Sequence, residues 1–224
     1  ARRKTNTMEQ MQILLAILVL LPFVSALLLA LCGSDRMRRL IVYGSAGVLM
    51  ISAVAFAVCF FSGENLQLRF LQSGGIIDHT MLALEAGFAV LITVLSIKYR
   101  RYYVAVLSIV QTVLTFVYEL GGYKPAVQPY NLFADQLTVI MVLIIAVVGT
   151  LITVYAVGYM RDYHSHHKEY TDRRRFFFAM LYVFLGAMFG LVLSNSLLWL
   201  YFFWEITSLV SFLLIGYTLS LIHI

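Results

Sequence analysis

The chain has 224 residues, of which 62% are hydrophobic and only 12% are Asp, Glu, Lys or Arg. A soluble domain carries about 25% charged residues, so this composition excludes a soluble enzyme, a nucleic-acid-binding domain and a disordered chain. The apolar residues lie in long blocks, each of about the length that spans a bilayer. We therefore expect an all-α fold, a polytopic transmembrane helical bundle.

Seven apolar blocks predict seven membrane-spanning helices, at 11–32, 40–62, 80–97, 102–120, 136–160, 176–193 and 197–219. The first block follows a polar tail over 1–10 and contains Pro22, which should kink its helix. It is too long for a secretory signal peptide and lacks a small-residue cleavage site. If translation starts at Met8, residues 1–7 are not native. The spans at 11–120 form a four-helix N-terminal membrane segment, and a second segment covers 134–219.

The net charge of +5 is better explained by membrane topology than by a nucleic-acid partner. The loops at 33–39, 98–101 and 161–175 together carry eleven Lys and Arg residues, whereas the opposite set carries five. The excess of positive charge predicts that the first set is cytoplasmic and that the N-terminus lies outside. Cys32 and Cys59 then lie on opposite faces and cannot form a disulfide.

Three glutamates lie inside the predicted spans, where an ionisable group costs about 2.5–3.5 kcal/mol at the bilayer centre and marks a functional candidate. Glu119 ends its span beside Gly121, and a water-exposed terminus is the favoured interpretation. Glu85 lies about 8 Å from the outer end of its span. It either faces a cavity in the protein or extends to the interface.

Glu205 is the deepest of these carboxyl groups, about 12 Å into a hydrocarbon core roughly 30 Å thick. Ser208 and Ser211 follow it at helical spacing, with Gly216 near the same face, so the helix carries a polar stripe. Desolvation favours the neutral carboxyl and a neighbouring cation favours the charged one, so the group can gain and lose a proton. The alternatives are a proton relay or a protonated glutamate that only joins two helices.

Other polar features carry weaker predictions. Gly186 and Gly190 form a G-x-x-x-G pair, which is typical of close helix packing. The cluster of His164, His166 and His167 is better explained as a solvated loop than as a metal site. We expect no cofactor, no metal and no catalytic redox residue on this chain, because cysteine clusters, phosphate-binding glycine loops and nucleophile triads are all missing from the sequence.

Several motifs together resemble one family. The run FWEITSLVSFLLIGY over 203–217 resembles the W-E-x-x-x-x-x-S-[FY]-L-L-I-G-[FY] signature of proton-translocating antiporter-like membrane subunits. Residues 134–160, 175–177 and 193–198 resemble three further elements in the same order. The family includes the large subunit of NADH:quinone oxidoreductase (complex I), the large subunit of the Mrp antiporter and subunits of membrane-bound hydrogenases. The chain resembles only its N-terminal part.

The resemblance implies a role for individual residues. The glutamate matching Glu205 pairs with a lysine on a later helix and drives protons along a mid-membrane polar axis, with Ser208 and Ser211 beside it. Asp135 matches an acidic residue of one of these motifs. It is a candidate for the residue that starts its helix and lies at the mouth of a cavity. Residues 134–219 correspond to the start of the proton-translocation domain. We expect that domain to be truncated here, since family members continue for several hundred residues.

The function implied by the resemblance is proton translocation in a respiratory NADH:quinone oxidoreductase-like or hydrogenase-like complex, coupled to electron transfer on partner subunits. The alternatives are a component of an Mrp-type cation/proton antiporter without redox chemistry, and a fragment with a structural role. The expected partners are other membrane subunits, the lipid bilayer and H⁺ or Na⁺, with no nucleic acid. The expected location is the inner (cytoplasmic) membrane, as a multi-pass protein.

Overall fold

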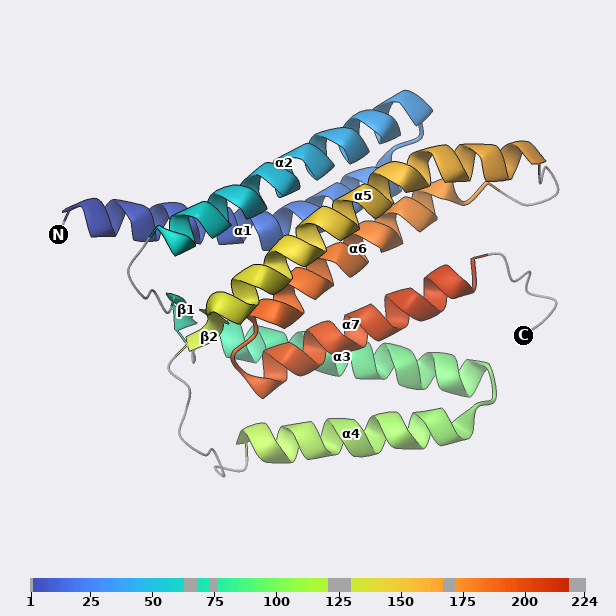
Figure 1. Ribbon diagram of the computed structural model, residues 1–224. Helices are drawn as coiled ribbons and strands as arrows, with labels where there is room; N and C mark the ends of the chain where they lie inside the picture. The colour runs from blue at the N-terminus through green and yellow to red at the C-terminus, as the bar shows by residue number, and fades with distance from the viewer. Residues whose placement is uncertain (1, 63–67, 73–75, 121–129, 167–171, 218–224) are drawn as a thin grey trace. The chain divides into compact units, whose positions relative to one another are not determined.

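The computed structural model of the chain describes residues 2–62, 68–72, 76–120, 130–166 and 172–217 (Figure 1). Its seven helices are α1 (Arg2–Leu31), α2 (Asp35–Phe61), α3 (Ile76–Lys98), α4 (Tyr102–Leu120), α5 (Gln136–His166), α6 (Arg174–Leu193) and α7 (Leu197–Ile215). Within the described residues, six helices are long and apolar enough to cross a membrane, and Tyr102–Tyr118 is a shorter apolar helix. The all-α polytopic bundle expected from the sequence is confirmed.

Several helices extend beyond the predicted spans, and α1 and α5 extend furthest. Helix α1 begins at Arg2 and so includes the polar tail, and it continues through Pro22. Helix α5 runs on to His166, six residues past the expected end at 160. The added residues include neither Gly nor Pro, so the backbone has no reason to leave the helix when it leaves the apolar block.

The chain divides into two compact units. The larger unit comprises Ala1–Leu68, Phe133–Leu193 and Phe203–Ile224, and the smaller unit comprises Arg69–Leu132 and Ser194–Phe202. Helix α7 contributes to both, with its first turns in the smaller unit.

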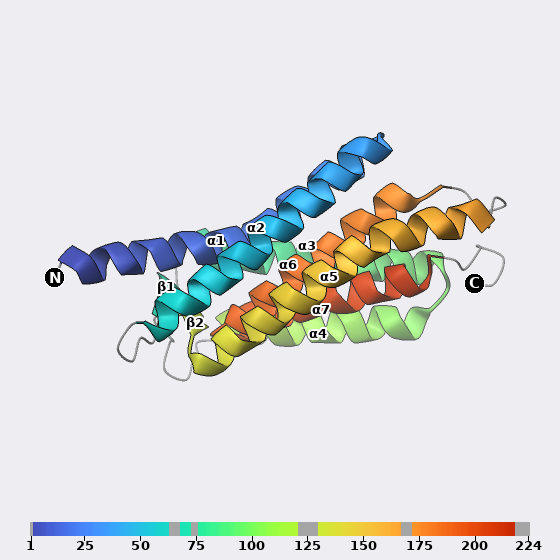
Figure 2. The same cartoon turned by 45° about the horizontal axis from the view of Figure 1, so that its top comes forward.

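The larger unit contains a four-helix arrangement in which α1 and α5 each pack against both α2 and α6 (Figures 1 and 2). Aromatic side chains fill its centre, and Phe56, Phe178, Tyr182 and Phe189 are all less than 2% exposed. Its outward residues are also apolar; Ile51 and Leu151, for example, are 71% and 58% exposed. An apolar exterior around a packed apolar centre is the surface that a lipid solvent requires.

The G-x-x-x-G pair of α6 packs closely against aromatic rings of the larger unit, as predicted. A Cβ atom added to Gly186 would lie 2.9 Å from the Phe23 ring of α1. A Cβ on Gly190 would overlap the Phe203 ring of α7. Neither glycine leaves room for a side chain, so both close approaches depend on glycine.

The smaller unit contains α3, α4 and most of a two-stranded sheet of β1 (Leu68–Gln72) and β2 (Tyr130–Ala134), which was not predicted from the sequence. Helices α3 and α4 pack together, and the Ser108 hydroxyl donates to the Ala89 carbonyl at 3.3 Å. The Asn195 amide Nδ2 donates to the Tyr130 carbonyl at 2.9 Å. The pairing of β1 with β2 and this hydrogen bond bring together segments that are distant in the sequence.

We expect Tyr182→Phe to lower the free energy of unfolding by about 1 kcal/mol, because a buried hydrogen-bonding hydroxyl is lost. The Tyr182 hydroxyl lies 2.6 Å from Ser45 Oγ and donates to the Val42 carbonyl at 3.1 Å, joining α6 to α2. Unfolding by denaturant in detergent measures the effect. Tyr155→Phe is the matched control, because Tyr155 is 72% exposed. Equal losses in the two variants would contradict the importance of this bond.

Candidate functional site

Glu205 lies in the middle of α7, eight residues after the helix begins at Leu197. Its side chain is half-buried, and the carboxylate oxygen Oε2 is shielded from solvent. On the same helix Ile206 and Val210 are 8% and 2% exposed, whereas Trp204 is 59% exposed. The carboxyl group therefore lies at the edge of the packed face of α7.

The two serines of the polar stripe follow Glu205 along α7. The Ser208 hydroxyl donates to the Trp204 carbonyl at 3.0 Å, and the Ser211 hydroxyl donates to the Thr207 carbonyl at 2.7 Å. Each proton is thus held by the helix's own backbone, an arrangement that often bends a helix. The hydroxyl oxygens keep lone pairs that accept hydrogen bonds. Membership of a proton chain stays a prediction for both serines.

The other three acidic residues that we considered as candidates, Glu85, Glu119 and Asp135, have different surroundings. Glu85 in α3 is 3% exposed, and this burial favours a carboxyl facing protein over one extended to the interface. The side chain of Glu119 lies outside the described residues. Asp135 Oδ1 accepts hydrogen bonds from the Thr138 backbone N–H at 2.8 Å and the Thr138 hydroxyl at 2.9 Å.

Asp135 therefore caps the start of α5. Thr138 donates both hydrogen bonds to the carboxylate and holds the pKa of Asp135 below its usual range. The cap fixes the residue at which α5 begins. A role for Asp135 at a cavity mouth stays a prediction.

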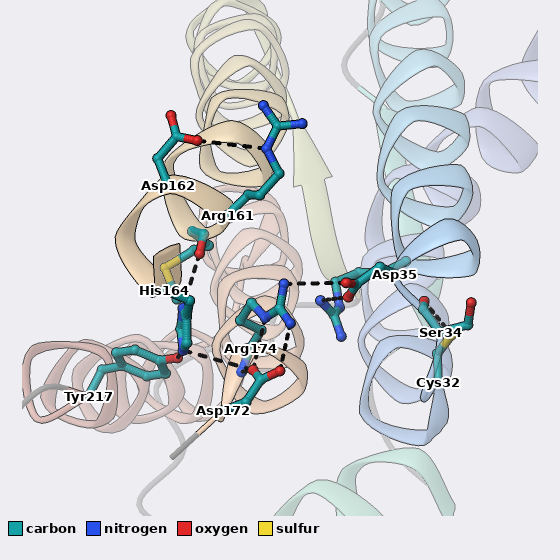
Figure 3. A network of polar contacts seen from close by, with 11 residues as sticks. Cys32, Ser34, Asp35, Arg161, Asp162, His164, Asp172, Arg174 and Tyr217 are labelled. Atoms are coloured by element: carbon teal, nitrogen blue, oxygen red, sulfur yellow. Dashed lines mark hydrogen bonds and ion pairs between the residues drawn. The ribbon is translucent and has the colours of Figure 1, made fainter. Parts of the chain in front are cut away.

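A polar network lies at one end of the larger unit and joins four helices or their ends (Figure 3). Arg174 Nη2 lies 2.7 Å from Asp172 Oδ2, and Arg174 Nη1 lies 3.4 Å from Asp35 Oδ2. His164 Nε2 lies 3.9 Å from Asp172 Oδ1 and 3.4 Å from the Tyr217 hydroxyl. The ion pair with Asp35 joins the start of α2 to the start of α6.

The expectation of a solvated loop is wrong for His164, whose side chain is 13% exposed and lies in the last turn of α5. His166 is exposed, and His167 lies outside the described residues. The network could not be predicted from the sequence because its members come from four separate segments. Across the described part of the chain, no three side chains of the His, Cys, Asp and Glu types gather as a metal site would require.

The Arg174 side chain, which hydrogen-bonds Asp172, holds the pKa of this carboxyl below its ordinary value of 3.8. A carboxyl with a depressed folded-state pKa stabilises the fold above its unfolded pKa, and this stabilisation is lost as the pH falls through the folded-state value. Since the Asp172 side chain is 50% exposed, the pair contributes at most about 1 kcal/mol.

We therefore expect Asp172→Asn to destabilise the protein at about pH 7 and to have a smaller effect at about pH 3, where the carboxyl is protonated in the unfolded chain but still ionised in the folded protein. Thermal unfolding in detergent at the two pH values measures the difference. Asp162→Asn is the control, because the Asp162 side chain is 72% exposed and lies 3.7 Å from Arg161. A penalty for Asp172→Asn that is the same at both pH values would count against the ion pair.

Residues 128–177 match the family described as NADH-Ubiquinone oxidoreductase (complex I), chain 5 N-terminus. This segment contains Asp135 and the whole of α5 but not Glu205.

Three bacterial relatives share longer stretches with the chain. It is 33% identical over 116 residues to the A1 subunit of a Na⁺/H⁺ antiporter of Staphylococcus haemolyticus, covering 52% of this chain and 13% of the relative. It is 40% identical over 88 residues to the A subunit of a Na⁺/H⁺ antiporter of Alkalihalophilus pseudofirmus, covering 39% and 10%. It is 28% identical over 155 residues to the A1 subunit of a Na⁺/H⁺ antiporter of Staphylococcus aureus, covering 62% and 18%.

The matches thus span between 10% and 18% of the length of these relatives. Together with the apolar helices, they agree with the motifs found in the sequence. These similarities support an assignment of the chain to the N-terminal part of the proton-translocating antiporter-like family of membrane subunits.

Proposed function

We propose that the chain is part of a protein that exchanges a cation for protons across a membrane, in the manner of its Na⁺/H⁺ antiporter relatives. The proposal depends on the position of Glu205, a carboxyl group in the middle of an apolar helix. The similarity to Na⁺/H⁺ antiporter subunits in three bacteria supports the exchange of Na⁺ for H⁺.

In this proposal Glu205 takes up a proton from one side and releases it towards the other. Its carboxylate oxygen Oε2 is shielded from solvent, so a proton held there is separated from bulk water. The lone pairs of Ser208 and Ser211, three and six residues further along α7, can accept hydrogen bonds and extend the polar stripe. Glu85, Glu119 and Asp135 are auxiliary proton carriers in the same proposal.

A second candidate function is redox-driven proton pumping within a respiratory NADH:quinone oxidoreductase-like complex. The match of residues 128–177 to the complex I chain 5 N-terminus favours it. Here electron transfer takes place on partner subunits and this chain supplies only part of the proton path. In both candidates the partners are other membrane subunits and the location is the cytoplasmic membrane.

Ion flux in everted membrane vesicles distinguishes the two functions. The full-length gene product and its neighbouring membrane subunits are expressed in cells that lack their own Na⁺/H⁺ antiporters, and a pH-sensitive dye reports the internal proton concentration. Under antiport, NaCl releases protons from acid-loaded vesicles and choline chloride does not. Proton uptake that requires NADH oxidation by the expressed complex, with no response to NaCl, would favour redox-driven pumping and contradict the antiporter proposal.

A further inference from the structure

A pocket of about 300 Å³ opens in the larger unit between α2, α5 and α6, and its lining is unusually rich in arginine. It lies at the end where Asp35 and Arg174 form an ion pair, which the charge distribution predicts to be cytoplasmic. Figure 3 shows Arg161 and Arg174 of neighbouring helices with Asp35 of α2 nearby. The charged residues of the lining are Asp35, Arg38, Arg39, Arg161 and Arg174, and its rings come from Tyr43 and Phe178.

The pocket carries an excess of positive charge that its own carboxylate cannot balance. Arg174 already engages Asp172 and Asp35, at 2.7 and 3.4 Å. Arg161 lies 3.7 Å from Asp162, but both side chains are more than 70% exposed, so solvent screens this pair. Helices α2 and α6 both begin beside the pocket, and the positive ends of their dipoles add to the attraction for an anion.

Arg38 supplies a second, independent sign of a ligand. The residue is 5% exposed, and its Nη1 donates to Asp35 Oδ1 at 2.7 Å. Its guanidinium lies 6.0 Å from the centre of the Phe178 ring. A further donor, Nε–H, is buried and has no hydrogen-bond partner within the described part of the chain. A buried donor left without an acceptor costs about 1–3 kcal/mol, so an acceptor brought by a ligand would be stabilised there.

We propose that this pocket binds a phosphate group at the membrane surface, with the phosphodiester of an anionic phospholipid as its source. Guanidinium groups match the geometry of phosphate oxygens, which take parallel hydrogen bonds from them. The rings of Tyr43 and Phe178 and the apolar outer faces of the helices suit the part of a lipid next to its headgroup. Basic pockets between membrane helices on the cytoplasmic side are a known type of headgroup site.

The pocket is separate from Glu205, and the proposal of a phosphate site does not depend on the proton transfer proposed for that residue. None of the residues that line the pocket belongs to α7. Inorganic phosphate offers the same oxygens as the lipid, so the experiment has one arm for each source. A lipid bound there would hold the ends of α2, α5 and α6 together.

The test measures binding to the full-length protein purified in a neutral detergent. One arm adds phosphatidylglycerol, with phosphatidylcholine as the neutral lipid, and the other adds inorganic phosphate. Native mass spectrometry counts retained lipid, and thermal unfolding reports stabilisation in both arms. We expect phosphatidylglycerol to bind and Arg38→Gln to weaken its binding about tenfold, the effect of losing charge-assisted hydrogen bonds.

Two further variants make the result decisive. Arg39→Gln removes an exposed charge of the same pocket, so it tests the site even if Arg38→Gln fails to fold, and we expect weaker lipid binding from it as well. Arg36→Gln removes an exposed charge from the same helical turn outside the lining, and we expect no change. If inorganic phosphate stabilises the protein, the lipid does not, and Arg39→Gln abolishes the effect of phosphate, then the lipid is overturned as the source of the bound phosphate group. Equal lipid binding by the wild type and by the Arg39 and Arg36 variants would overturn the site.

Discussion

Replacing Glu205 with Gln should reduce cation/proton exchange by about 100-fold or more, the scale on which a positioned proton-transfer group acts. The amide keeps the size and hydrogen-bonding capacity of the side chain but cannot release a proton. Glu205→Asp keeps a carboxyl group that is one methylene shorter, and we expect it to retain part of the activity. The sodium-induced release of protons from everted vesicles measures all three proteins.

The control for this prediction is Glu9→Gln, which removes an exposed carboxyl at the start of the first apolar block and should leave exchange unchanged. The amounts of each component in the membrane must match the wild type, so that loss of assembly is not counted as loss of transport. If Glu205→Gln exchanges ions at the wild-type rate in a fully assembled complex, the carboxyl only joins helices and the relay proposal is lost.

The second large effect is expected at Gly190, where a leucine should destabilise the larger unit by about 1–3 kcal/mol or more. A Cβ at this position overlaps the Phe203 ring, so the added side chain must force α6 and α7 apart. Gly186→Leu should act in the same direction against Phe23 of α1. Unfolding in mixed micelles of increasing SDS content measures the loss.

Gly47→Leu is the matched control for these variants. A Cβ on Gly47 in α2 meets nothing within 4 Å, so the leucine enters open space. Leucine also favours a helix over glycine by up to about 1 kcal/mol, so this variant should be neutral or more stable. Similar losses at Gly47 and Gly190 would show that the effect comes from the substitution type and not from packing.

The helices could be predicted from the sequence because membrane spans depend on local composition. Long apolar blocks leave the backbone no partner except itself, and the helix follows. The ends were harder to predict, since residues 161–166 are mostly polar but contain no helix breaker and so continue α5. The short strands β1 and β2 pair across distant parts of the chain, which no local pattern reveals.

The candidate site could be predicted only in part, for a related reason. A carboxyl such as Glu205 is conspicuous in an apolar block, and its depth follows from helical rise alone. Asp135 at the head of α5 was likewise visible as a helix start. In contrast, the network around Asp172 and the pocket around Arg38 depend on several helix ends meeting in space. From the sequence alone, these residues could be interpreted only as charged loop residues that indicate the membrane topology.

Infrared difference spectroscopy tests the central claim, that Glu205 carries the transported proton, most directly. Membranes containing the assembled protein are perfused with and without NaCl at fixed pH, and the carbonyl stretch of protonated carboxyl groups is recorded. We predict that sodium removes a protonated-carboxyl band from the wild type and that this change is missing in Glu205→Gln. A sodium-dependent carboxyl band that persists unchanged in Glu205→Gln would contradict the claim and assign the proton to another group.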